Sequence, residues 1–393
     1  SRSQGRHPTE ARWGNNETSG GGTREGRSHF ARAHGGVQEK VGHSVCCSLK
    51  EQDKTKPKLD NKMVHIDPKK HNTILADAVW RLEAQLGHVA FSARYHQLPR
   101  RIEDDYTITT EVLGSGMNGK VMSAIRKGCH SGQMYAVKSF SLKQVALKKR
   151  KQFAAEAELF LCMDHPNVCR LYDVYESSDY LHLVMEQLDG GELFDRIKTQ
   201  KVFSEHEAAE VAWQLLLALN YLHSHGIVHG DVKLDNILYD SKGSKHMKLI
   251  DFGFSKRWDP LKRNVTGRMC GTQSYISPEV FLEQPCSSQC DQWSLGVVIF
   301  ALLSGYMPFC KPEEIVKGNF KVIHEKWKHV SEDAMSFVAS LLTVDPEQRL
   351  TAERALQHPW ITKRHAQGIH QVDPVTVEAL RNFSHCPVFR RCC

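Results

Sequence analysis

Residues 229–236 read His-Gly-Asp-Val-Lys-Leu-Asp-Asn, and this stretch limits the possible folds of the chain more than any other. Fifteen residues after it comes Asp251, the first residue of an Asp-Phe-Gly triplet. These residue types suit phosphoryl transfer, because an aspartate (Asp231) can accept a hydroxyl proton and a lysine (Lys233) can neutralise the moving phosphoryl group. An asparagine carbonyl (Asn236) and the Asp251 carboxylate are suited to hold the Mg²⁺ that bridges nucleotide phosphates.

A glycine-rich segment lies upstream, where residues 114–121 read Gly-Ser-Gly-Met-Asn-Gly-Lys-Val. Glycines let backbone N–H groups approach phosphates because no Cβ intervenes. Dinucleotide-binding turns share this pattern, but they place a helix directly after the glycines. Here two apolar runs, 121–125 and 134–138, flank a glycine-containing turn, which predicts a strand, a turn and a second strand. The dinucleotide alternative is therefore disfavoured.

The two downstream motifs resemble the catalytic loop and the metal-binding loop of eukaryotic protein kinases, and residues 114–121 resemble the loop that these kinases fold over ATP. Residues 271–279 resemble the segment that closes the activation loop, with Ser-Pro-Glu where the family has Ala-Pro-Glu. Residues 291–296 resemble a buried supporting helix, and residues 345–360 resemble the end of the fold. The resemblance covers about residues 106 to 361, with the family's elements in order.

This resemblance implies an α+β, bilobal protein-kinase fold. A small β-rich N-lobe (106–185) would contain helix C, and a larger, mainly helical C-lobe (189–361) would follow. The implied cofactors are ATP and Mg²⁺. The implied catalytic and positioning residues are Lys138, Glu156, Asp231, Lys233 and Asn236. The residues implied to bind ATP are Gly114, Ser115, Gly116, Gly119, Val121, Ala136, Lys138, Met185, Glu186, Leu188 and Asp251. The metal ligands would be Asn236 and Asp251, and the substrate-facing residues Glu192, Asp235 and Thr272.

Two ion pairs are implied by the same resemblance. Lys138 ends the second apolar run in an Ala-Val-Lys context and would pair with Glu156 on the next helix. Glu158, two residues further, would point to another face of that helix, and we expect it to be solvated. Arg349 is expected to form a buried ion pair with Glu279, since an exposed pair would contribute almost nothing to stability.

Several shorter segments resemble the calcium/calmodulin-dependent kinase group, and within it the calcium-dependent kinases of plants and protists. Those proteins carry an autoinhibitory junction and four EF-hands after the kinase domain. Residues 375–383 look like the start of such a junction, so we interpret 362–393 as a partial junction-like tail. The sequence contains no EF-hand loop. A regulatory partner, or an EF-hand module outside this sequence, is therefore expected to supply any Ca²⁺ response.

One residue departs from the family in an informative way. The family's His-Arg-Asp is His-Gly-Asp here, with Gly230 in the arginine's place. That arginine normally pairs with a phosphate on the activation loop, for which Thr266 is a candidate site. We therefore expect a loop that orders without phosphorylation. A nucleotide-binding pseudokinase scaffold and a small-molecule kinase are the alternatives. The intact set of catalytic residues disfavours the first, and the peptide-positioning segment 271–279 disfavours the second.

The flanking regions and the composition indicate a disordered extension and a cytoplasmic location. Residues 1–71 are rich in Gly, Ser and basic residues, so we expect a disordered extension, followed by a short helical lead-in over 72–105. No apolar run is long enough for a transmembrane helix. The net charge of +7 comes without a dense basic block, which argues against nucleic acid as a partner. The 12 cysteines lack zinc-site spacing, so free thiols in the cytoplasm are expected, with the nucleus as the alternative. A first residue other than Met suggests a piece of a longer product.

Overall fold

A computed structural model describes residue 75 and residues 93–116, 119–129, 132–199, 204–259, 264–265 and 271–365. The chain divides into two units, Ser1–Val64 and His65–Cys393, and every described residue belongs to the second. The expected disordered extension, residues 72–74 and 76–92 of the helical lead-in expected over 72–105, Thr266 and the junction-like residues 375–383 lie outside the described residues.

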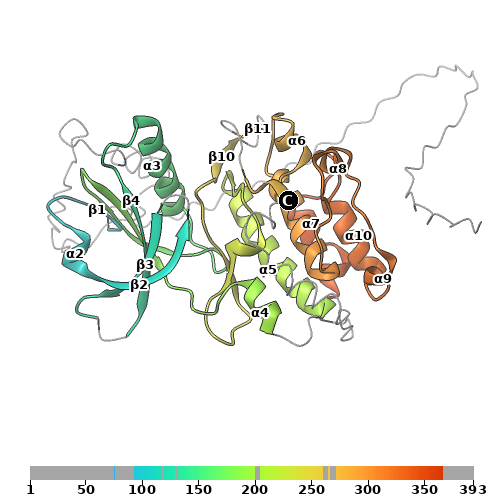
Figure 1. Ribbon diagram of the computed structural model, residues 1–393, viewed down its shortest axis with the longest axis horizontal. Coiled ribbons are helices and arrows are strands. Elements are labelled where there is room, and N and C mark those ends of the chain that lie inside the picture. Colours follow the sequence, from blue (N-terminus) through green and yellow to red (C-terminus); the bar gives the residue numbers. More distant parts are fainter. Residues whose placement is uncertain are drawn as a thin grey trace, which may run out of the picture. The chain divides into compact units, whose positions relative to one another are not determined.

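The N-terminal part of the second unit is built on a six-stranded sheet with the order β1-β5-β6-β4-β3-β2 (Figure 1). The strands are β1 (Tyr95–Gln97), β2 (Tyr106–Gly116), β3 (Gly119–Arg126), β4 (Met134–Ser141), β5 (Leu171–Glu176) and β6 (Tyr180–Glu186). Neighbouring strands are antiparallel except β1, which runs parallel to β5. The strand, turn and strand expected after the glycine-rich segment are present as β3 and β4.

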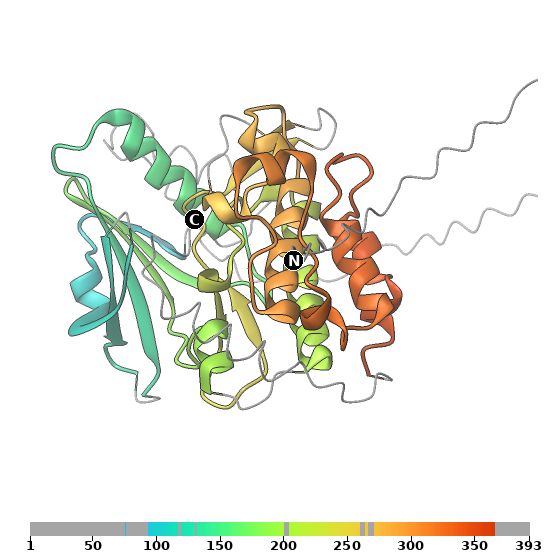
Figure 2. The same ribbon diagram turned by 45° about the vertical axis from the view of Figure 1, so that its right-hand side comes forward.

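Helix α3 (Leu147–Leu161) packs on one face of this sheet (Figure 2). Phe153 of α3 stacks on Phe140 of β4, with ring centroids 4.4 Å apart. The opposite face of β4 is also covered, because Tyr135 and Val137 pack with residues of the short helix α2 (Ile102–Asp105) and its neighbours. Strand β4 is therefore buried on both faces, which fixes the position of the lysine that it carries.

The rest of the unit is mainly helical. Its helices are α4 (Leu193–Thr199), α5 (Glu205–Ser224), α6 (Pro278–Phe281), α7 (Gln289–Ser304), α8 (Pro312–Lys317), α9 (His324–Trp327), α10 (Glu332–Leu341), α11 (Ala352–Leu356) and α12 (Pro359–Thr362). Short strands and two 3₁₀ turns connect them: β7 (Ile227–Val228), β8 (Ile237–Tyr239), β9 (Met247–Leu249), β10 (Lys256–Asp259), β11 (Asn264–Val265), η1 (Leu234–Asn236) and η2 (Gln273–Tyr275). No helix among the described residues has both the length and the apolar character needed to cross a membrane.

Local sequence explains where the main helices begin and end. The hydroxyl of Ser204 accepts a 3.1 Å hydrogen bond from the amide of Glu207, whose carboxylate accepts one from the Ser204 amide. This capping box satisfies two backbone donors at the start of α5. Helix α7 is buried along nearly its whole length and ends at Gly305, whose φ of 77° favours glycine.

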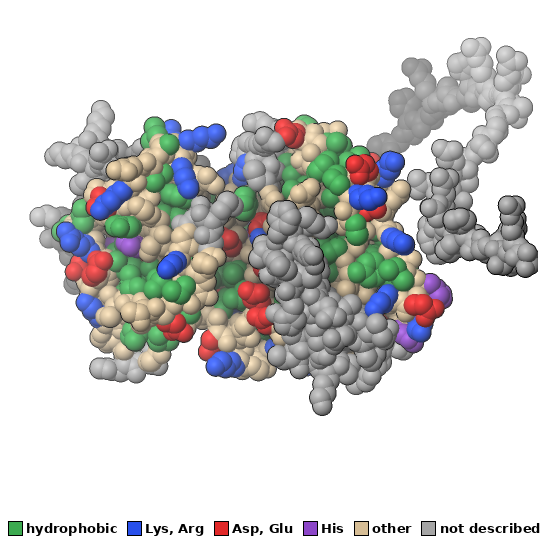
Figure 3. All heavy atoms as spheres, in the orientation of Figure 1, with side chains coloured by type: hydrophobic (Ala, Val, Ile, Leu, Met, Phe, Trp, Pro, Cys, Tyr) green, Lys and Arg blue, Asp and Glu red, His purple; other side chains and the backbone are tan. Residues whose placement is uncertain are grey.

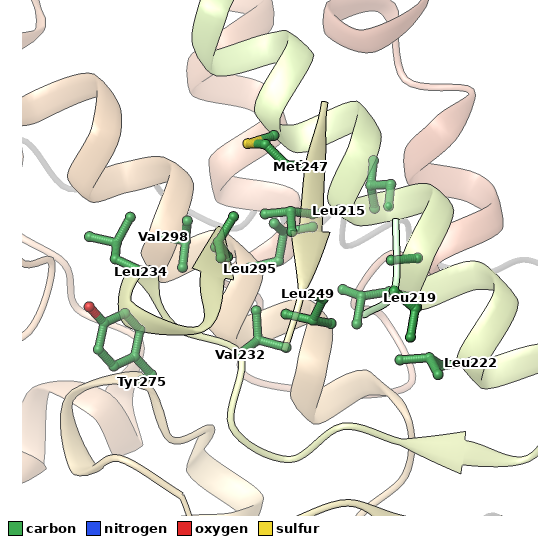
Figure 4. Packing of buried hydrophobic residues seen from close by; sticks show 14 of the residues in the cluster. Leu215, Leu219, Leu222, Val232, Leu234, Met247, Leu249, Tyr275, Leu295 and Val298 are labelled. Carbon is green, nitrogen blue, oxygen red and sulfur yellow. The ribbon is translucent and has the colours of Figure 1, made fainter. Parts of the chain in front are cut away.

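The hydrophobic core of the helical part lies directly below the catalytic-loop sequence. Figure 4 shows Val232 and Leu234 among buried side chains from α5, β9 and α7. These two residues alternate with Asp231 and Lys233 along the chain. Packing of the apolar residues therefore turns the polar residues of the loop away from the core.

The expected ion pair between Arg349 and Glu279 is buried. Its two nitrogen–oxygen contacts are 2.8 and 3.0 Å, and the side chains are 0% and 4% exposed. The same guanidinium donates to the carbonyl oxygens of Gln289, Thr343 and Val344. The pair links the end of the activation segment to the C-terminal helices.

Candidate active site

Lys138 of β4 lies between two carboxylates. Its Nζ is 2.7 Å from Oε1 of Glu156 on α3 and 2.9 Å from Oδ1 of Asp251. The structure thus brings together three of the residues implied from sequence, two from the N-lobe and one from the loop after β9. An inward position of α3 and of Asp251 is the arrangement that protein kinases need for phosphoryl transfer.

The charges of this group support one another. Burial lowers the pKa of the Lys138 ammonium, but the carboxylates of Glu156 and Asp251 outweigh that effect and raise it. Burial also opposes ionisation of Asp251, yet the ammonium keeps the pKa of that carboxyl below its usual value. Burial raises the pKa of Glu156, and Lys138 counters this rise. At neutral pH the lysine and Asp251 therefore carry opposite charges.

The catalytic-loop residues form a second polar group around Asp231. Oδ2 of Asp231 is 2.6 Å from Nζ of Lys233, and Oδ1 accepts hydrogen bonds from the amide and the hydroxyl of Thr272 at 3.0 and 2.9 Å. Lys233 also donates to the Thr272 hydroxyl at 3.1 Å. Thr272 belongs to the segment that would position a peptide, so the structure joins that segment directly to the candidate base.

Asn236 and Asp251 fit the role of metal ligands. The Asn236 amide nitrogen donates to the backbone oxygen and to Oδ2 of Asp231, at 2.8 and 3.1 Å, which leaves its amide oxygen as the free acceptor. Oδ2 of Asp251 has no hydrogen-bond partner among the described residues, since Lys138 occupies Oδ1. No cluster of three or more protein ligands occurs in the described ranges. Mg²⁺ typically takes one or two protein oxygens and completes its shell with phosphates and water, so two such residues suffice.

A buried aspartate of α7 holds the catalytic loop in place through hydrogen bonds. Asp291 accepts hydrogen bonds from the amides of His229 and Gly230, at 2.9 and 2.8 Å, and from the His223 ring at 2.9 Å. Burial opposes its ionisation, but the His223 ring and the Gly230 amide hold the pKa of this carboxyl below its usual value. Sequence similarity indicated a supporting helix at 291–296, but the partner His223 carried no signal, because polar pairs far apart in sequence leave no periodic pattern.

The Asp-Phe-Gly triplet is anchored by its phenylalanine. Phe252 is 1% exposed and packs between Phe160 of α3 and the ring of His229, each with a centroid distance of 5.0 Å. Asp251 itself has a positive φ of 61°. The buried ring therefore fixes the turn that presents the Asp251 carboxylate to Lys138.

The described residues of the glycine-rich segment lie at the end of β2 and the start of β3. Gly114 pairs with Val121, Ser115 with Lys120 and Gly116 with Gly119. Gly119 has a φ of +133°, and a Cβ there would lie 2.9 Å from a backbone oxygen of β4. Glycine is thus required at this point of the hairpin by conformation and by space.

The predicted adenine-binding residues lie on β4 and at the end of β6. Ala136 pairs with Met185 in the β4–β6 ladder. The Glu186 amide donates to the Arg170 carbonyl at 2.9 Å, so the backbone group that Glu186 could offer to a ligand is its carbonyl. The amide of Leu188 has no backbone partner among the described residues. This edge can supply an acceptor and a donor two residues apart.

The two predicted substrate-facing acids lie near the catalytic loop. Glu192 precedes α4 and forms an isolated antiparallel bridge with Leu238, while Asp235 lies in the η1 turn beside Asn236. Both side chains are partly exposed. Figure 3 shows Asp and Glu side chains beside the hollow between the sheet and the helical part.

Glu158 contacts a different partner from Glu156, as expected for another face of α3, but the expectation that it is solvated was wrong. Its side chain is 22% exposed, and Oε1 lies 3.5 Å from Nη2 of Arg257 on β10. Arg257 also reaches Sγ of Cys162 at 3.7 Å, just past the end of α3. Helix α3 therefore contacts the activation segment through a face that was expected to be solvated.

Comparison with known sequences identifies the family. Residues 107–361 match the family described as "Protein kinase domain". A calcium/calmodulin-dependent protein kinase type 1 of Caenorhabditis elegans is 38% identical over 260 residues, which cover 64% of this chain and 73% of that protein. Ribosomal protein S6 kinase alpha-1 of Rattus norvegicus is 39% identical over 272 residues, or 66% of this chain and 36% of the relative. A probable myosin light chain kinase of Dictyostelium discoideum is 33% identical over 275 residues, covering 67% and 68% of the two chains.

The chain belongs to the protein kinase family. Among solved structures, titin kinase with its flanking domains matches with a TM-score of 0.67 and 28% identity, covering 75% of this chain and 53% of that one. A twitchin kinase fragment of Caenorhabditis elegans matches with a TM-score of 0.65 and 29% identity, covering 74% and 65%. The chain thus spans about half to two thirds of these solved chains.

The relatives also confirm the type of kinase. This kinase is a protein serine/threonine kinase of the calcium/calmodulin-dependent group, with the expected bilobal α+β fold. As a member of the family it uses ATP, typically with a divalent metal. The narrower resemblance to calcium-dependent kinases of plants and protists stays a prediction.

Proposed function

We propose that this kinase transfers the γ-phosphoryl group of Mg²⁺-bound ATP to Ser or Thr hydroxyls of protein substrates, in contexts that contain arginine. The observation that carries the proposal is the assembled site. Lys138 contacts both Glu156 and Asp251, and Asp231 contacts both Lys233 and Thr272. The residues within each of these two polar groups are already in contact in the structure.

Each residue has a distinct part in the proposed reaction. Asp231 orients the substrate hydroxyl and accepts its proton. Lys233 neutralises charge on the transferred group, and Lys138, held by Glu156, binds the α- and β-phosphates. Asn236 and Asp251 would hold the metal. When bound, Mg²⁺ neutralises the charge that develops on the phosphate oxygens.

A phosphoryl-transfer assay separates this proposal from its alternatives. The purified chain is incubated with Mg²⁺, γ-labelled ATP and a basic Ser-containing peptide, and the label on the peptide is measured. Transfer to the peptide supports the proposal. Nucleotide binding without transfer would indicate a pseudokinase scaffold, an alternative suggested by Gly230 in place of the family's arginine. Transfer only to small molecules would indicate a small-molecule kinase.

The preference for arginine rests on Glu192 and Asp235. Arginine suits a carboxylate because its guanidinium can donate two parallel hydrogen bonds. In a positional peptide library we expect selection for Arg three residues before the acceptor. Glu192→Ala should weaken that preference by roughly 5- to 150-fold in kcat/KM, whereas the poor Arg-free peptides should be unaffected. Equal loss on every peptide would make Glu192 a structural residue.

The regulatory and cellular parts of the proposal are simpler to test. Because the sequence lacks an EF-hand loop, we expect the activity of this chain to be equal in Ca²⁺ and in EGTA. A response that requires calmodulin would assign the chain to the calmodulin-regulated branch.

We also propose a cytoplasmic location, with the nucleus as the alternative, since the described cysteines are free thiols. Cell fractionation tests this point.

A further inference from the structure

The segment just before the family-matching region adds a strand to the N-lobe sheet and contacts helix α3. Within the lead-in predicted over 72–105, residues 93–100 include β1 and end before α2. From here on, the lead-in segment means residues 93–100. We propose that Arg94 of this segment is a positioning residue that holds the C-terminal turn of α3, and through α3 the contact between Glu156 and Lys138. The inference rests on the proposed kinase activity, because its readout is phosphoryl transfer.

The guanidinium of Arg94 joins the helix to the sheet. Its Nη2 donates to the carbonyl oxygen of Leu161, the last residue of α3, at 2.5 Å. Its Nη1 donates to the carbonyl oxygen of Leu171, the first residue of β5, at 3.1 Å. Both acceptors lie within the fork of one planar group, a geometry that arginine provides and lysine does not.

Helix α3 depends on such outside contacts because its own sequence caps it poorly. Its N-cap, Ala146, offers no side-chain acceptor, and its first turn contains no acidic residue. Its last turn contains no basic residue, although the carbonyls at a helix C-terminus carry partial negative charge. Arg94 therefore supplies from another part of the chain the cation that the helix lacks.

The position of that turn matters for the site. Glu156 lies five residues before Leu161 on the same helix. A tilt of α3 at its C-terminal end would move the Glu156 carboxylate away from Lys138, because the helix moves as a rigid rod. Arg257 of β10 contacts the same turn through Glu158 and Cys162. The end of α3 is thus held by one arginine from the lead-in segment and one from the activation segment.

The lead-in segment is itself firmly attached, so Arg94 can be changed without losing it. Tyr95 pairs with Val174 in the parallel ladder, and its hydroxyl donates to Glu176 at 2.5 Å. The His96 ring lies 2.8 Å from the Asp173 carboxylate. These buried contacts hold the strand in place independently of the arginine side chain.

The test compares three single variants of the full chain. Arg94→Ala is expected to lower kcat/KM for ATP by about tenfold, the scale of one hydrogen bond from a charged donor. Arg94→Lys should lose about threefold, because it keeps the charge but cannot reach both carbonyls. Arg100→Ala is the matched control: Arg100 lies in the same segment and pairs with Asp105, and no contact with α3 is found for it among the described residues. Its activity should stay within about twofold of the wild type.

A double-mutant cycle shows whether Arg94 acts through Glu156. In a Glu156→Gln background, Arg94→Ala should cost less than about twofold, because the contact that it supports is already broken. Amide hydrogen exchange should also rise in the last turn of α3 in Arg94→Ala and not in Arg100→Ala. If Arg94→Ala melts below the assay temperature, Arg94→Lys carries both measurements.

Three results would overturn the inference. They are unchanged activity in Arg94→Ala, equal losses in Arg94→Ala and Arg100→Ala, and a loss that is fully additive with Glu156→Gln. A wild-type chain that binds nucleotide but transfers no phosphate would instead contradict the proposed function. In that case the hydrogen-exchange comparison still decides whether Arg94 positions α3.

Discussion

The amide of Gly230 donates a 2.8 Å hydrogen bond to Oδ1 of Asp291, and Gly230 adopts a left-handed φ of 78°. A backbone contact to a buried carboxylate thus fixes the residue before the catalytic aspartate. Glycine takes this conformation without strain, whereas an L side chain there costs roughly 1–2 kcal/mol. With glycine at residue 230 the loop adopts this conformation without strain, but it has no side chain there to bind a phosphate.

We expect the kinase to remain active without phosphate on its activation loop. Purified protein treated with a phosphatase should keep most of its initial rate, because Thr272 already contacts Asp231 and Arg257 already contacts Glu158. Initial rates before and after treatment provide the measurement. A fall of about tenfold or more, reversed by phosphorylation at Thr266 or another loop hydroxyl, would show that some other cation replaces the family's arginine.

Asp231→Asn should separate binding from chemistry. The amide keeps the size of the carboxylate but cannot accept the substrate proton, so kcat should fall by at least ~100-fold. The affinity for nucleotide should change little, since the phosphate-binding residues Lys138 and Asp251 lie elsewhere in the site. Steady-state kinetics and binding of a fluorescent ATP analogue measure the two quantities. Turnover equal to the wild type would remove Asp231 from its proposed role.

Breaking the ion pair between Arg349 and Glu279 should destabilise the helical part strongly. Arg349→Leu is expected to lower the free energy of unfolding by about 3–5 kcal/mol, because it leaves a buried carboxylate unpaired. The control is Lys328→Ala, which removes an exposed pair with Glu325 and should cost less than about 0.5 kcal/mol. Urea unfolding monitored by circular dichroism measures both variants.

A second variant shows where that stability comes from. The double variant Arg349→Leu with Glu279→Leu should stay well below the wild type, since three backbone carbonyls also depend on the arginine. Full recovery in the double variant would mean that the charge of Glu279, and not the carbonyl contacts, dominates the loss.

The stability of the lead-in segment should depend on pH in the acid range. Hydrogen bonds from Arg100, with a smaller one from Tyr175, hold the pKa of Asp105 at about 2 against an ordinary value of 3.8, although burial opposes the shift. Because this pKa is depressed, the stabilisation is complete above about pH 4 to 5 and is lost as the pH falls toward 2. The Arg100 side chain is 52% exposed, so solvent screening limits the effect to ~1 kcal/mol.

Asp105→Asn therefore should unfold about 1 kcal/mol more easily than the wild type at pH 7, and the gap should narrow between pH 5 and pH 3. Urea midpoints across this range measure the gap. A gap of constant size would show that Asp105 acts through its shape and hydrogen bonds alone.

Short motifs explain why much of the site was predictable. Asp231, Lys233 and Asn236 lie within six consecutive residues, so their proximity is set by local spacing. The family resemblance located Lys138 and Glu156. The contacts that were missed join residues far apart in sequence through polar atoms. Strand β1 is three residues long, reads Tyr-His-Gln and has no apolar alternation. The pairs of His223 with Asp291 and of Arg257 with Glu158 likewise leave no pattern that a single sequence can reveal.

Strand β1 also determines how the sheet meets its surroundings. Without it, the outer edge of β5 would present unpaired backbone donors and acceptors, which are a template for association with another chain. With it, the last strand on that side of the sheet is only three residues long, a length that offers little to a foreign strand. A chain cut back to residues 107–361 would keep every catalytic residue but would lack β1, so the family-matching region does not contain every strand of the N-lobe sheet.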